Sequence, residues 1–99
     1  VRAYAGNCRV LLISPIELGN DVWQDKYDPQ FDAGSPAVSR NLKYTFAKVA
    51  RKHGTDILAA SDHAKPSSRD CEHLDENGHN ALARAVEDKI LSIYGRAAS

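Results

Sequence analysis

The sequence predicts an α/β fold in which parallel strands alternate with covering helices. Three observations lead to this fold class. Two short apolar runs are typical of buried strands, a segment with apolar residues at helical spacing lies between them, and a second such segment follows the later run. Strands that alternate with helices in this way are typical of βα units built on a parallel sheet.

The first expected strand covers residues 9–14, a continuous apolar run that ends at Ser14-Pro15. Residues 15–34 show no periodicity and are expected to form a loop. Loops of this length are uncommon in compact domains and are usually functional.

A helix is expected over residues 36–53, because Ser35 suits the N-cap position and Pro36 the first helical position. Gly54 is the expected stop. Apolar residues recur at helical spacing along this segment and predict its buried face: Val38, Leu42, Phe46, Val49 and Ala50.

Residues 55–60 form the second expected strand, and residues 61–74 form a polar loop. Asp75 is a plausible N-cap for a helix over residues 75–94 that ends near Gly95. Two strands make a poor sheet, because three or more are normally needed for independent stability. We therefore expect further strands from a missing N-terminal segment or from a partner chain, with a homo-oligomer as one possibility. The start at Val1 and the lack of any methionine favour a piece of a longer protein.

The charge balance argues against nucleic acid as a partner, because 13 Lys and Arg residues match 13 Asp and Glu residues. No apolar run approaches the ~20 residues needed to span a bilayer. Cys8 and Cys71 lie far apart and form no CxxC pair, so reduced thiols in a cytoplasmic protein are expected.

Asp70 and His73 form the one pair of residues with a recognisable chemical arrangement. The two residues lie three positions apart just before the last expected helix, so they can share one turn. The carboxylate of Asp70 can then accept a hydrogen bond from one imidazole nitrogen of His73, and the other nitrogen is free to face a catalytic site. A hydrolytic triad needs this pairing of acid and base. Taken alone, the same spacing is more often a helix cap beside a surface histidine.

The segment Asp70-Cys71-Glu72-His73-Leu74, with Gly78-His79 and an amphipathic helix after it, resembles the closing block of SGNH (GDSL) hydrolases. The strand at residues 10–15 and the helix–strand unit at 43–60 are similar to the parts that precede this block, so the resemblance covers nearly the whole chain. Among the subgroups of this family, the resemblance is strongest to the arylesterase-like one. The resemblance implies a three-layer α/β/α, flavodoxin-like fold, of which this chain would be the C-terminal portion without the N-terminal strands.

In that family the acid and base of the closing block belong to a Ser-His-Asp triad, which here implies Asp70 and His73. The implied activity is that of a serine ester hydrolase or acyltransferase acting on a small acyl ester, with no metal and no cofactor. Ile16 and Trp23 are expected to line the substrate pocket, although the loop aromatics fit packing against a sheet or an oligomer interface equally well. The Gly-Asp-Ser block is absent, so the chain alone is predicted to be inactive until an N-terminal segment supplies the serine.

Alternative interpretations remain open. The chain fits a non-catalytic interaction or regulatory domain, in which Asp70 and His73 only tie the loop to the helix. A zinc site is the other alternative, although its candidate ligands fit no standard spacing: His63, Asp70, Cys71, His73 and His79. Ser14 and Ser61 are poor substitute nucleophiles, and Gly19-Asn20-Asp21 is interpreted as a turn rather than as the family's Gly-x-Asn-Asp block.

Overall fold

The computed structural model describes residues 8–98, and their side chains as far as Gly95. Five elements follow one another: β1 (Leu11–Ser14), α2 (Ser35–His53), β2 (Asp56–Ala59), the single 3₁₀ turn η1 (Ala60–Asp62) and α3 (Glu76–Ala98). The two strands pair in parallel, with Leu11 opposite Asp56 and Ser14 opposite Ala59. The predicted α/β class with parallel strands is therefore confirmed.

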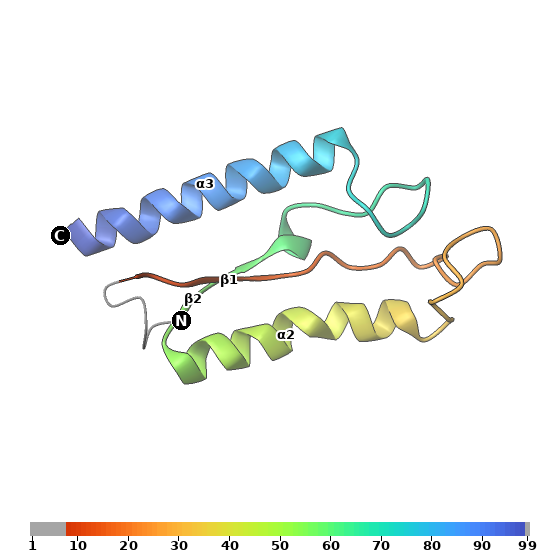
Figure 1. The fold of residues 1–99 in the computed structure, drawn as a ribbon, viewed down its shortest axis with the longest axis horizontal. Helices are drawn as coiled ribbons and strands as arrows, with labels where there is room; N and C mark the ends of the chain where they lie inside the picture. The colour runs from red at the N-terminus through yellow and green to blue at the C-terminus, as the bar shows by residue number, and fades with distance from the viewer. Residues whose placement is uncertain (1–7, 99) are drawn as a thin grey trace.

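The elements form three layers, with α2 and α3 on opposite sides of the strand pair (Figure 1). Both helices run back from the carboxyl ends of the strands toward their amino ends (Figure 1). The segment after β1 and the segment before α3 therefore meet at one end of the sheet. In open α/β sheets the carboxyl ends of the strands are where ligands bind.

The start of α2 differs from the expected N-cap. The helix begins at Ser35, and Gly34 occupies the cap position without a side-chain cap. Ser35 Oγ is instead engaged with Asp32, from whose backbone N–H it accepts a hydrogen bond of 3.0 Å. The expectation of a Ser35 cap was wrong because the Ser35 hydroxyl already accepts the hydrogen bond from the N–H of Asp32. The expected stop is present, since Gly54 has a left-handed φ of 64°.

The buried face of α2 is narrower than the apolar pattern predicts. Ser39 and Ala50 are buried, whereas Val38 and Val49 are 65% and 46% exposed. The helix covers only two strands, so the flanking valines reach beyond the sheet. Ser39 Oγ donates to Pro36 O at 2.7 Å and accepts from Leu18 N–H at 3.0 Å, which ties the helix to the segment after β1.

The helix α3 is capped as expected but is longer. Asp75 Oδ1 accepts a hydrogen bond of 2.7 Å from the N–H of Gly78, so Asp75 is the N-cap. The helix then continues through Gly95 to Ala98. The expected end near Gly95 was wrong because this glycine does not adopt the left-handed conformation that Gly54 uses. Ile93 is buried on the inner face of α3.

The loop over residues 15–34 is a chain of tight turns. The N–H groups of Val22, Gln24 and Tyr27 each bond to the carbonyl three residues earlier. Val22 is completely buried and is the largest fully buried side chain of the described residues. The described helices include none that is long and apolar enough to cross a bilayer.

Candidate active site

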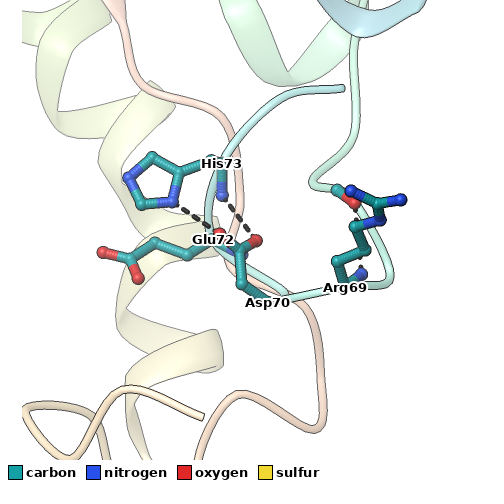
Figure 2. Close-up of polar contacts among 5 residues, drawn as sticks. Arg69, Asp70, Glu72 and His73 are labelled. Carbon is teal, nitrogen blue, oxygen red and sulfur yellow. Dashed lines mark hydrogen bonds and ion pairs between the residues drawn. The ribbon is translucent and has the colours of Figure 1, made fainter. Parts of the chain in front are cut away.

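The structure brings Asp70 and His73 into direct contact in the loop between η1 and α3. His73 Nδ1 lies 2.6 Å from Asp70 Oδ2 (Figure 2). The other carboxylate oxygen, Asp70 Oδ1, accepts the backbone N–H groups of Glu72 and His73, each at 2.9 Å. The carboxylate is thus fixed by three hydrogen bonds, and one of them orients the imidazole.

The far side of the imidazole is open. His73 Nε2 points away from Asp70 (Figure 2), and the His73 side chain is 74% exposed. Arg69 lies on the other side of Asp70, with its guanidinium directed away from the His73 ring (Figure 2). The arrangement leaves Nε2 available to a group that approaches from outside the described residues.

Both titratable groups respond to this contact. The N–H groups of Glu72 and His73, followed by the imidazole, lower the pKa of the Asp70 carboxyl from 3.8 to about 2. The hydrogen bond to Asp70, and then its negative charge, raise the pKa of His73 above 6.5. Asp70 therefore remains ionised at neutral pH, and His73 is a stronger base than a free imidazole.

Backbone hydrogen bonds hold the loop that presents the pair. The N–H of Cys71 donates to Ser67 O at 2.8 Å, and the N–H of Ser67 donates to His73 O at 2.7 Å. Cys71 adopts a left-handed φ of 59° and is buried. This conformation is uncommon for a residue with a Cβ and is retained only where the surroundings enforce it.

A close approach of Gly19 fixes the same loop from the other side. The N–H of Gly19 donates to Cys71 O at 2.8 Å. A Cβ at Gly19 would lie 2.6 Å from the Cys71 Cβ, a distance that forces one of the two segments to move. The sequence predicts only a turn at Gly19, and this contact could not be predicted because no local pattern reports an approach between residues 52 positions apart.

Glu72 is a second residue that sequence analysis did not single out. Atoms of Asp70, Glu72 and His73 lie within 4.8 Å of one another, and Glu72 extends beside the imidazole (Figure 2). In the part of the chain that the structure describes, this is the group whose ligand atoms lie close enough together to hold a metal ion. It excludes His63, Cys71 and His79, so the zinc set considered from the sequence is not assembled.

The remaining candidates are Ile16, Trp23, Ser14 and Ser61. Ile16 is half-buried and Trp23 is 48% exposed. Ser14 Oγ and Ser61 Oγ are buried and lack hydrogen-bond partners among the described residues, so neither hydroxyl is engaged by His73. Pocket lining by Ile16 and Trp23 stays a prediction.

A cavity of about 600 Å³ opens at the carboxyl ends of the strands, and its wall includes Cys71, the residue after Asp70. Three segments contribute to its wall: the turn after β1, the first half of α2 and the loop before α3. Its lining includes Glu17, Gly19, Arg40, Lys65, Ser67 and Cys71. The volume lies within the range of small-molecule sites, about 300–1,000 Å³.

No protein-family model and no curated protein matches the chain. One crystal structure matches 88% of the chain with a TM-score of 0.81 and 32% sequence identity. The crystal structure of Est24, a carbohydrate acetylesterase from Sinorhizobium meliloti, matches 86% of the chain with a TM-score of 0.71 and 24% identity. The chain spans 39% of the length of each of these structures. These matches support the fold.

Proposed function

We propose that this chain supplies the acid and the base of a Ser-His-Asp triad in an ester hydrolase of the SGNH type. The observation that carries the proposal is the 2.6 Å contact between Asp70 and His73, made at the carboxyl ends of parallel strands. Two further observations support it. The closing block Asp70-Cys71-Glu72-His73-Leu74 resembles that of the family, and a structure with the same fold is a carbohydrate acetylesterase.

In the proposed mechanism His73 acts as the general base. Asp70 accepts the Nδ1–H of His73, which selects the tautomer whose Nε2 is free to accept a proton. His73 Nε2 takes the proton of a serine hydroxyl as the oxygen attacks the acyl carbonyl, and returns it to the leaving alcohol. Asp70 stays ionised and stabilises the transient imidazolium, because two backbone N–H groups hold its charge.

The serine is proposed to come from a complementary N-terminal segment. Gly-Asp-Ser does not occur in this sequence, and His73 contacts no hydroxyl among the described residues. A general base without a nucleophile has nothing to activate, so the isolated chain should not hydrolyse esters. With the nucleophile present, water or an alcohol completes the second half-reaction, which gives hydrolysis or acyl transfer.

The test is reconstitution. The part of the matched structure with 32% identity that lies outside the match, which is proposed to carry the serine, is fused to residues 1–99, and hydrolysis of p-nitrophenyl acetate is measured. We expect turnover by the fusion and none by either part alone. His73→Ala should lower kcat by on the order of a thousandfold or more. His63→Ala, an exposed histidine outside the pair, is the matched control and should leave kcat unchanged. Equal kcat in the fusion and in its His73→Ala variant would end the proposal.

A further inference from the structure

The cavity at the carboxyl ends of the strands carries more positive than negative charge in its wall. Arg40 and Lys65 face Glu17 alone among the charged residues of its wall. This excess does not reflect composition, because the whole chain carries equal numbers of cationic and anionic residues.

Neither cation has an anionic partner among residues 8–98. The ion pairs of the described residues involve Arg9, Lys43 and His73, so neither Arg40 nor Lys65 has a carboxylate within 4 Å. Arg40 is nevertheless held in place, because its Nη1 donates to the amide oxygen of Asn20 at 3.0 Å. A neutral partner orients the guanidinium without neutralising it and leaves most of its five donors free.

The rest of the polar lining also suits an anion. Ser67 and Ser68 add hydroxyl groups to the wall. The Ser67 hydroxyl accepts the N–H of Arg69 at 3.1 Å and so retains its own proton for donation. A fixed guanidinium, an ammonium and hydroxyl donors match the oxygens of a carboxylate or a phosphate.

We propose that this cavity binds an oxyanion, and that in the intact enzyme it holds the carboxylate or phosphate group of an anionic ester substrate. The second part rests on the proposed function. The cavity wall includes Cys71, which lies between Asp70 and His73 in the sequence. Two residues of chain span at most about 7 Å, so the Cα atoms of Cys71 and His73 lie within that distance of each other. The cavity wall therefore adjoins the segment that carries the pair.

The first experiment needs no nucleophile. The 99-residue chain, labelled with ¹⁵N, is titrated with inorganic phosphate and separately with succinate at constant ionic strength. Saturable shifts are expected at millimolar concentrations for the amides of Gly19, Ser67 and Ser68. The double variant Arg40→Gln/Lys65→Gln should weaken binding about tenfold. Glucose, a neutral probe, should produce no comparable shifts.

A matched variant separates the site from general charge. Lys48→Gln/Lys52→Gln removes the same charge from exposed positions of α2 outside the cavity. It should leave the affinity for phosphate unchanged. Shifts that do not saturate, or equal weakening by both double variants, would overturn the oxyanion site and leave the acid–base role of Asp70 and His73 in place.

The second experiment uses the reconstituted enzyme. For an ester that carries a carboxylate, Arg40→Gln/Lys65→Gln should raise KM about tenfold with little change in kcat, and the KM of a neutral isosteric ester should not change. A rise in KM of equal size for both esters would contradict the assignment of the cavity to the anionic group. The effect of His73→Ala tests the proposed function alone. It does not bear on the KM comparison, which is made with His73 in place.

Discussion

Replacing Gly19 with alanine tests the contact that joins the long loop to the Asp70–His73 segment. The new Cβ would lie 2.6 Å from Cys71 Cβ and 3.0 Å from Cys71 Sγ, which is buried and has little room to move. Overpacking of this kind costs about 1–3 kcal/mol. Separation of the segments would also weaken the hydrogen bond from Gly19 N–H to Cys71 O, at a cost of about 1 kcal/mol.

Urea denaturation of the two chains measures this cost, and we expect Gly19→Ala to lower the free energy of unfolding by about 2–4 kcal/mol. Gly95→Ala is the matched control, because a Cβ there meets nothing within 4 Å. It should raise the free energy of unfolding by up to about 1 kcal/mol, since alanine favours a helix interior.

A double-mutant cycle with Cys71→Gly localises the effect. Glycine removes the two Cys71 atoms that the new Cβ approaches most closely, and it accepts the φ of 59° without strain. In the Cys71→Gly background, Gly19→Ala should therefore cost less than half of its cost in the natural chain. The same cost in both backgrounds, or no cost in either, would refute the close approach described for Gly19.

Three further predictions concern the pair and the helix that follows it. In an NMR titration of the imidazole, Asp70→Asn should lower the pKa of His73 markedly, because the substitution removes the hydrogen-bonded carboxylate and its charge. Glu72→Gln should lower the pKa of His73 less, because Glu72 acts through its charge alone. The pair should stabilise the folded chain most between pH 3.8 and 6.5, and urea midpoints measured across pH would show this. The contribution of Asp70 is lost as the pH falls toward about 2. The contribution of His73 is lost as the pH rises through the raised pKa of its imidazole. Asp75→Ala should cost about 1 kcal/mol, measured by urea denaturation, because it leaves the N–H of Gly78 without its cap.

Local sequence patterns predicted the parts of the fold that depend on local chemistry. The stop at Gly54 and the cap at Asp75 each follow from one residue and its immediate neighbours. The Asp70–His73 contact belongs to the same class, because both residues lie on one turn and Asp70 needs only its own loop to bind two backbone N–H groups. Their role in catalysis remains a proposal.

Apart from the start of α2 and the end of α3, which failed on local grounds, the features that the sequence did not predict depend on contacts between distant segments. Val38 and Val49 fit a helical stripe, yet they are exposed because the strand pair beneath α2 is narrow. The burial of Val22 and the approach of Gly19 to Cys71 arise only when the segment after β1 folds against the loop before α3. The cavity is of the same kind, since Arg40 and Lys65 line its wall from two segments that no periodicity connects.

Covalent labelling of the serine tests the central claim most directly. A fluorophosphonate reacts with a serine only when a general base activates the hydroxyl, and mass spectrometry of the reconstituted enzyme would report the modified residue. We expect rapid labelling of the serine when the 99-residue chain is present, and labelling slower by on the order of a thousandfold with His73→Ala. Equally rapid labelling in the His73→Ala enzyme would contradict the assignment of this imidazole as the base.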